Sequence, residues 1–363
     1  MREIYRSIIN KSDPETLHNF VKNGLNLLEY SRATLSVLES LSGGKIDPAE
    51  EKRLNVNLSG VEFKNPLLVA AGWTKEGQAV EALTKLGFGS VVVGTVTEHP
   101  QEGNPRPRVS PVSHGVIYNH MGFPGPGMQV VAGNLEKYKD KKIPIGISIG
   151  KNKKVPNFES PQVYAKILNR LYDSGSYFEI NISSPNTPGL RELQDKWLLT
   201  DIIQYCKSVT KDKNPKPLFV KVSPDLNFAQ LEEIIKVVFD NGGSGLVIAN
   251  TTNNSEIKSK YSRGGSPGGI SGDDIEYRKL VTKLVKHTAR ITDGTMGIIA
   301  VGGIHNTETA IAMLTSGATL LEIFTAIRSE GLGVAGKINN GILDYMDKYG
   351  FNNVTELVGI NVK

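Results

Sequence analysis

Apolar runs too short for helices recur along most of the chain, and polar or glycine-rich stretches follow them. Most of the runs are continuously apolar, which is typical of parallel strands covered on both faces. The eight predicted strands are LLVAA (67–71), SVVVG (90–94), PIGISIG (144–150), FEINIS (178–183), LFVKV (218–222), GLVIAN (245–250), GIIAV (297–301) and TLLEIF (319–324).

Segments in which the apolar residues follow helical spacing lie between several of these strands, at 228–240, 274–290 and 306–315. Eight strand and helix units in about 300 residues favour an α/β fold of the TIM (β/α)8 barrel type. A doubly wound parallel sheet stays open, because strand count alone does not exclude it. Ahead of the barrel, NVNLSGVEF (55–63) predicts a β-hairpin that turns at Ser59 and Gly60.

The first 45 residues differ from the rest, because their apolar residues follow helical spacing. Asp13, Pro14 and Glu15 form a typical helix start, and Gly43 with Gly44 ends the run. We expect two or three short helices set apart from the barrel, an extension of residues 1–45 before a catalytic domain of residues 46–363. The apolar positions are Ile4, Ile8, Ile9, Leu17, Phe20, Val21, Leu25, Leu28, Leu35, Leu38 and Leu41.

The composition, with 39% hydrophobic and 22% charged residues, is ordinary for a globular protein. The net charge of +5 is scattered, so nothing specific points to nucleic acid. The single cysteine, Cys206, excludes an intramolecular disulfide and a cysteine zinc cluster, and its IIQYC context predicts burial in a helix. We find no signal peptide and no run of about 18 apolar residues, and therefore expect neither a membrane span nor export.

Barrel active sites lie at the carboxyl ends of the strands, and these ends are polar or rich in glycine here. Gly302 and Gly303 follow the seventh strand, where backbone N–H groups could hold a phosphate or simply form a tight turn. The segment GGSPGGISG (264–272) lies in a long loop, which favours ligand contact over packing.

Lys75 and Lys221 lie at or near strand ends, where a cation needs a ligand anion or a buried carboxylate. We note no acidic residue among the strand ends, so we favour ligand binding for both lysines. Four asparagines have the paired donors and acceptors that suit a planar imide or amide, although each could be a turn residue. They are Asn119, Asn181, Asn186 and Asn250.

Ser184 in NISSPNT is a candidate base or nucleophile, but its spacing alone favours a turn-capping role. None of the six histidines shows the spacing of a metal site or a triad, and we predict no metal. The histidines are residues 18, 99, 114, 120, 287 and 305.

Several segments together resemble the dihydroorotate dehydrogenase family, from Asp13 to the C-terminal helix. NISSPNTPGLR is the most specific of them. Serine at position 184, where the soluble subclass places a cysteine, and the helical extension resemble the quinone-linked subclass. The matching segments are NPLLVAAGWTKEGQAVEALTKLGFG, GTVTEHPQEGNPRPR, IGKNK, NISSPNTPGLRELQ, VKVSPDL, ANTT, GGISG and AVGGI.

The resemblance implies oxidation of dihydroorotate to orotate in pyrimidine synthesis, with non-covalent FMN and with Ser184 as the catalytic base. The implied substrate-binding residues are Lys75, Asn119, His120, Met121, Gly122, Phe123, Asn181, Asn186, Asn250 and Thr251. The implied FMN-binding residues are Ala70, Ala71, Gly72, Thr95, Asn119, Ser148, Asn181, Lys221, Ala249, Thr251, Ser271, Gly272, Val301, Gly302, Gly303, Phe324 and Thr325.

The chain departs from the family pattern at four positions. Ser148 and Pro124 replace the usual asparagines, Ala249 replaces a threonine, and Thr74 replaces an aspartate. These changes put the four contacts in doubt and could alter flavin affinity or redox potential. They leave Ser184 and both lysines in place.

The resemblance also implies that the helical extension forms an entrance for ubiquinone or menaquinone at a membrane. Residues 1–53 contain eight Lys/Arg and eight Asp/Glu, so membrane contact would depend on apolar burial. We expect a peripheral location at the cytoplasmic face of the inner cell membrane. The alternative is a helical lid on a soluble enzyme.

Three other functions stay open. A different FMN barrel, such as a dihydropyrimidine or dihydrouridine reductase, would share the flavin cradle. A dihydroorotate dehydrogenase linked to fumarate or NAD would differ in its electron acceptor. A barrel that only binds a phosphate ligand would carry no flavin.

Overall fold

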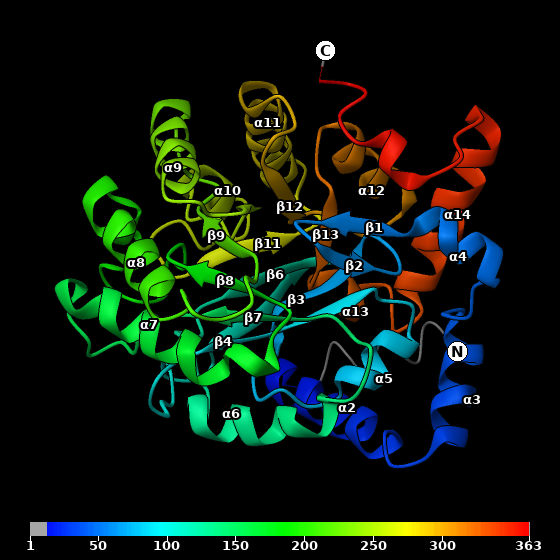
Figure 1. Ribbon diagram of the computed structural model, residues 1–363, viewed down its shortest axis with the longest axis horizontal. Coiled ribbons are helices and arrows are strands. Elements are labelled where there is room, and N and C mark those ends of the chain that lie inside the picture. Colours follow the sequence, from blue (N-terminus) through cyan, green and yellow to red (C-terminus); the bar gives the residue numbers. More distant parts are fainter. Residues whose placement is uncertain (1–12, 363) are drawn as a thin grey trace.

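The eight apolar runs form one closed parallel barrel in the computed structural model, which describes residues 13–362 (Figure 1). The last strand pairs with the first, so the barrel prediction is confirmed and a doubly wound sheet is excluded. Strands follow one another around the barrel in chain order. They are β3 (Leu67–Thr74), β4 (Ser90–Val96), β7 (Ile145–Ile149), β8 (Tyr177–Asn181), β9 (Leu218–Val222), β10 (Gly245–Ile248), β12 (Gly297–Val301) and β13 (Leu320–Ile323).

Helices cover the outside of the barrel, and local caps fix where several of them begin. Asn227 forms a capping box with Gln230, and Asp274 accepts a hydrogen bond from the backbone of Tyr277. Cys206 is buried in one of these helices, as predicted, and burial raises the pKa of its thiol. The helices are α5 (Val80–Lys85), α6 (Met128–Leu135), α7 (Ser160–Leu171), α8 (Lys196–Ser208), α9 (Phe228–Asp240), α11 (Ile275–Thr292), α12 (Thr307–Thr315) and α14 (Val334–Tyr349).

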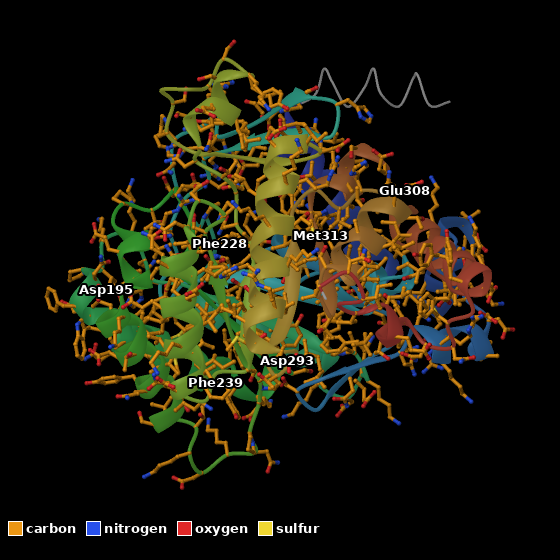
Figure 2. All side chains as sticks on the ribbon, turned by 90° about the horizontal axis from the view of Figure 1, so that it is seen from above. Asp195, Phe228, Phe239, Asp293, Glu308 and Met313 are labelled. Atoms are coloured by element: carbon orange, nitrogen blue, oxygen red, sulfur yellow. The ribbon has the colours of Figure 1, made fainter. Side chains whose placement is uncertain are left out.

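Helices that connect successive parallel strands run in the same direction, because each returns the chain to the start of the next strand. Figure 2 shows α11 between α9 and α12, with Phe239 and Asp293 near the same ends of α9 and α11. Shorter helices lie in the connections. They are α10 (Ser255–Ser259), α13 (Thr325–Ser329) and the 3-10 turns η1 (Glu136–Tyr138), η2 (Asn157–Glu159), η3 (Tyr172–Ser174), η4 (Leu190–Gln194) and η5 (Val354–Leu357).

The predicted hairpin closes the amino-terminal end of the barrel. It consists of β1 (Val56–Leu58) and β2 (Val61–Phe63), with Ser59 and Gly60 at φ 52° and 86° in the turn. The ring of Phe63 meets Tyr177 at the start of β8, with ring centroids 5.7 Å apart. Because apolar side chains fill this end, the opposite end is left for a ligand.

A small antiparallel sheet that the sequence did not predict lies at the carboxyl end of the barrel. It consists of β5 (Val109–Ser113), β6 (Val116–Asn119) and β11 (Gly269–Gly272), with β6 in the middle. The sheet joins the loop after β4 to the loop after β10. The glycine-rich segment 264–272 is thus partly a strand.

The N-terminal extension forms α2 (Pro14–Leu28) and α3 (Arg32–Ser42), followed by α4 (Pro48–Leu54). Asp13 caps α2 and Gly43 ends α3 with a φ of 71°, as predicted. The predicted positions Ile4, Ile8 and Ile9 lie outside the described residues.

The extension packs on the barrel, where α2 contacts α5 and β5. Lys22 pairs with Glu76 at 2.6 Å, and Glu15 pairs with Arg108 at 2.6 Å. These ion pairs fix α2 beside the carboxyl end of β3. Among residues 13–362, no helix is long and apolar enough to cross a membrane.

Candidate active site

A cavity lies at the carboxyl ends of the barrel strands, under the β5–β6–β11 sheet. It encloses about 1170 Å³, including its opening to solvent, and the size suits a cofactor together with a small substrate. Its lining comes from seven of the eight barrel strands or the loops after them, and from the small sheet.

Almost all of the residues implied by the resemblance line this one cavity. Two do not. His120 lies behind Asn186, with Nδ1 3.3 Å from its Oδ1, and Ser148 lies behind Thr95, with 3.0 Å between their hydroxyl oxygens. The lining members are Ala70, Ala71, Gly72, Lys75, Thr95, Asn119, Met121, Gly122, Phe123, Asn181, Ser184, Asn186, Lys221, Ala249, Asn250, Thr251, Ser271, Gly272, Val301, Gly302, Gly303, Phe324 and Thr325.

The asparagines are held by a chain of side-chain hydrogen bonds. Asn181 Nδ2 donates to Thr95 Oγ1 at 2.7 Å, and its Oδ1 accepts from Ser183 Oγ at 3.1 Å. Asn250 Nδ2 donates to the same Ser183 hydroxyl at 3.0 Å. Because these amides are fixed by neighbours, they present preset donors and acceptors to the cavity.

Ser184 has the turn-capping role as well as a place in the cavity. Its Oγ accepts a hydrogen bond from the backbone N–H of Asn186 at 3.2 Å, and only 4% of the residue is exposed. The hydroxyl proton has no acceptor within residues 13–362. Capping therefore orients the hydroxyl and leaves its proton free for other partners.

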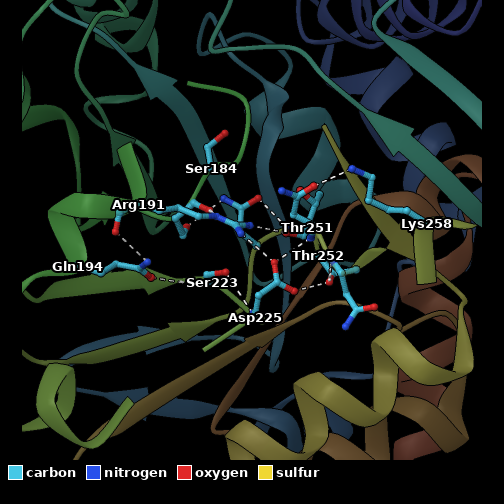
Figure 3. A network of polar contacts seen from close by, with 12 residues as sticks. Ser184, Arg191, Gln194, Ser223, Asp225, Thr251, Thr252 and Lys258 are labelled. Atoms are coloured by element: carbon cyan, nitrogen blue, oxygen red, sulfur yellow. Dashed lines mark hydrogen bonds and ion pairs between the residues drawn. The ribbon is translucent and has the colours of Figure 1, made fainter. Parts of the chain in front are cut away.

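Arg191 holds the loop that carries Ser184, as Figure 3 shows. Its guanidinium donates to the carbonyl oxygens of Ser183 at 3.0 Å and Thr251 at 3.1 Å. A third nitrogen pairs with Asp225 at 2.8 Å. Asp225 in turn accepts from the hydroxyl of Thr252, so the loops after β8, β9 and β10 form one network.

We expect Arg191→Ala to lower kcat by about 10- to 100-fold, since small displacements of a reacting group cost rate steeply. The variant loses the contacts that position the Ser184 loop, but no group that lines the cavity. Hydrogen exchange of residues 183–194 should become faster in parallel. Arg170→Ala, which removes an exposed hydrogen bond to Gln129, is the matched control. Unchanged exchange and turnover would rule out the positioning role.

Lys75 lies half-buried at the cavity, beside α2. Burial lowers the pKa of its ammonium, while Glu76 raises it and Lys22 lowers it. Within the described part of the chain its Nζ has no hydrogen bond or ion pair at contact distance. Such a cation suits an anionic ligand.

Lys221 corrects one prediction from the sequence, because it has acidic partners. Its Nζ lies 2.7 Å from Glu322 and 3.6 Å from Glu179. Both glutamates lie inside strands and not among the residues that follow the strands. Lys221 and Glu322 also line the cavity, so the lysine has both a buried partner and a possible ligand.

Gly302 and Gly303 form the turn after β12 against α11. A Cβ on Gly302 would lie 2.5 Å from Tyr277 Oη, and one on Gly303 would lie 2.9 Å from Arg278 Cβ. Their φ values are 124° and 73°. Neither N–H donates to a residue of the described chain, so both can serve a phosphate.

The family model of dihydroorotate dehydrogenase matches residues 53–346. This chain belongs to the dihydroorotate dehydrogenase family. The quinone-dependent dihydroorotate dehydrogenase of Nitratiruptor is 34% identical over 99% of both chains. That of Natronomonas pharaonis is 38% identical over 87% of both chains.

Solved dihydroorotate dehydrogenases share the fold. The enzyme from Eimeria tenella in complex with ferulenol superimposes with a TM-score of 0.87 at 30% identity, covering 97% of this chain and 96% of that one. The ligand-free form of that enzyme superimposes with a TM-score of 0.82 at 30% identity, covering 91% of this chain and 99% of that one.

The dihydroorotate dehydrogenase family is flavin-dependent, and two buried hydroxyl groups support a fit to a flavin. Thr251 Oγ1 and Ser329 Oγ have no hydrogen-bond partner in residues 13–362, and both residues line the cavity. With the free N–H groups of Gly302 and Gly303, they offer four polar atoms to a cofactor with a phosphate and a polar chain.

Sequence reasoning missed several residues of this dihydroorotate dehydrogenase cavity. Tyr277 of α11 supports the site, since its hydroxyl donates to the carbonyl of Asn250 at 2.9 Å. Glu322 could have been found, because an acidic residue within an otherwise apolar strand is a signal by itself. No local signal marks the other missed residues, which are Val109, Gly115, Ile117, Asp273, Ile304, His305, Ala326 and Ser329.

Proposed function

We propose that this chain oxidises (S)-dihydroorotate to orotate in pyrimidine (UMP) biosynthesis, with FMN as hydride acceptor and a quinone as final electron acceptor. One observation carries the proposal: Ser184, Lys75 and four asparagines, which come from four separate segments of the chain, line the same cavity. The family match and the quinone-dependent relatives support the same reaction.

The substrate is a ring with a planar imide part and a carboxylate, and each feature has a suitable partner. Lys75 binds the carboxylate through its ammonium. The ring amides pair with the amides of Asn119, Asn181, Asn186 and Asn250, which are held in place by their own hydrogen bonds.

Ser184 takes the proton from C5 of the substrate and releases its own hydroxyl proton toward the solvent opening of the cavity. A serine hydroxyl is a weak base, so it needs a fixed orientation and little water. The N–H of Asn186 orients the oxygen, and burial of Ser184 excludes water. A bound FMN would supply the acceptor for the hydride that leaves C6. Gly302 and Gly303 would hold its phosphate, and Lys221 would lie near its polar ring edge.

The visible spectrum of the purified protein under anaerobic conditions tests this function. Addition of L-dihydroorotate should bleach a bound-flavin band. Bleaching by dihydrouracil alone would favour a dihydropyrimidine reductase, and a colourless folded protein would indicate a binding protein. Turnover with fumarate or NAD in place of ubiquinone or menaquinone would place the enzyme in a soluble subclass.

We further propose that the extension of residues 1–45, which precedes the catalytic barrel, contacts the membrane and admits quinone. Large apolar side chains on α2, α3 and the turn between them are exposed, and the ion pairs of α2 fix that helix beside the carboxyl end of β3. A peripheral position at the cytoplasmic face of the inner cell membrane follows from this proposal. The exposed side chains are Phe20 and Leu27 on α2, Tyr30 in the turn, and Val37 and Leu41 on α3.

Replacing Phe20 and Leu41 by aspartate should weaken binding to phosphatidylethanolamine/phosphatidylglycerol vesicles by at least roughly tenfold, since burial of such side chains contributes about 1.5–3 kcal/mol each. Vesicle sedimentation measures the loss, and anaerobic flavin reduction by dihydroorotate should stay normal. Phe239→Asp is the control, because Phe239 is exposed on α9 away from the extension. Equal loss in the control would contradict membrane contact through α2 and α3.

A further inference from the structure

The barrel interior contains two carboxyl groups that share a single ammonium group. Lys221 Nζ lies 2.7 Å from Glu322 Oε2 and 3.6 Å from Glu179 Oε2. Exposure of the three side chains is 6% for the lysine and 0% for each glutamate. The cluster borders the cavity through Lys221 and Glu322, and Glu179 lies deeper.

The charges of this cluster do not balance if both glutamates are ionised. Three carboxyl oxygens, both of Glu179 and Oε1 of Glu322, have no hydrogen-bond donor in the described chain. The other titratable group facing Glu179 is Tyr177, which is neutral, since burial and both glutamates raise the pKa of its phenol. A buried carboxylate without donors costs several kcal/mol, so two ionised glutamates beside one lysine are unfavourable.

One proton between the two glutamates removes this imbalance. It leaves one carboxylate for the one ammonium group, and it supplies an O–H donor for a carboxylate oxygen. Consistent with this, burial, followed by the charge of Glu322, raises the pKa of Glu179 well above its ordinary value. Glu322 keeps the shorter contact with Lys221 and therefore carries the negative charge.

We infer that Glu179 and Glu322 share one proton and one negative charge beneath Lys221, and that this acid pair is a positioning element that sets the positive charge presented to the flavin. The inference rests on the proposed flavin site. An ammonium group near the ring favours the reduced, negatively charged flavin, and an adjacent carboxylate offsets that effect. The pair thus holds the flavin at a lower midpoint potential than Lys221 alone would give.

The single charge can be carried by either glutamate, which gives an unusual expectation for variants. In Glu179→Gln a neutral group replaces a neutral acid, and the charge on Glu322 remains. In Glu322→Gln the like-charge neighbour of Glu179 is gone, so Glu179 ionises opposite Lys221. Only the double variant removes the charge.

The midpoint potential of the bound flavin tests this in the purified holoenzyme. Each single variant should stay close to wild type. The double variant should show at least a tenfold higher ratio of reduced to oxidised flavin at a fixed solution potential, which is about 30 mV for a two-electron couple. Additive increases in the two single variants would mean two buried charges and would overturn the inference. An unchanged double variant would overturn the coupling to the flavin.

Infrared spectroscopy gives a readout that needs no flavin. The wild type at neutral pH should show a protonated carboxyl C=O band that is lost in Glu179→Gln and also in Glu322→Gln. Glu98→Gln is the control, because Glu98 is a buried glutamate with its own lysine partner, Lys166. Absence of the band in the wild type would refute the shared proton even if the double variant did not fold. If the purified protein carried no flavin but kept the band, the proposed function would be refuted and the shared proton would stand.

Discussion

Ser184→Ala should lower the rate of flavin reduction by dihydroorotate by about 10²- to 10⁴-fold, the usual contribution of a positioned general base. The flavin should stay bound, because Ser184 lies in the loop after β8 and the proposed phosphate site lies after β12. The backbone N–H of Asn186 loses its acceptor, which is a smaller effect on the loop. Anaerobic stopped-flow measurement of flavin bleaching gives the rate directly.

Two further variants separate the base from general damage to the loop. Ser184→Cys restores an ionisable group at the same place, so its rate should exceed that of Ser184→Ala and rise with pH as thiolate forms. Ser160→Ala is the matched control, since Ser160 is a buried serine on α7 that makes no side-chain hydrogen bond to the described residues. A Ser184→Ala rate within a few-fold of wild type would remove Ser184 from the mechanism.

The barrel could be predicted because its strands are continuously apolar and its turns are local. Gly43 and the Ser59–Gly60 turn lie where the sequence placed them, since positive φ values favour particular residues at particular steps. The predicted ends of the strands were less accurate. β3 continues to Thr74, and β8 ends at Asn181, because pairing with neighbouring strands decides where a ladder stops.

Contacts between distant segments could not be predicted in the same way. The pairing of β11 with β6 joins segments 150 or more residues apart, and polar strand residues give no signal for it. Lys221 and Glu322 are separated by 101 residues and meet only because the barrel closes. The asparagines were found because strand ends converge, whereas Glu179 was missed because it lies within a strand.

Lys75→Met should lower kcat/KM for dihydroorotate by roughly 30- to 4000-fold, since loss of one partner of a buried charge pair costs about 2–5 kcal/mol. The main effect should be on KM, because the carboxylate is bound in the ground state as well as in the transition state. Lys236→Met, on an exposed i,i+4 pair with Asp240, is the control and should behave as wild type.

The pH dependence of KM gives the sign of the same interaction. Only the protonated Lys75 attracts a carboxylate, and burial lowers the pKa of Lys75. KM should therefore begin to rise at a lower pH than it would with a lysine of ordinary pKa. In the wild type the negative charge of Glu76 raises the pKa of Lys75, and Glu76→Gln removes that charge. Lys22 also loses its ion-pair partner, so its positive charge lowers the pKa of Lys75 further. Both effects shift the rise in KM to still lower pH. If KM did not change with pH below the ordinary lysine pKa in either the wild type or Glu76→Gln, the substrate carboxylate would bind elsewhere.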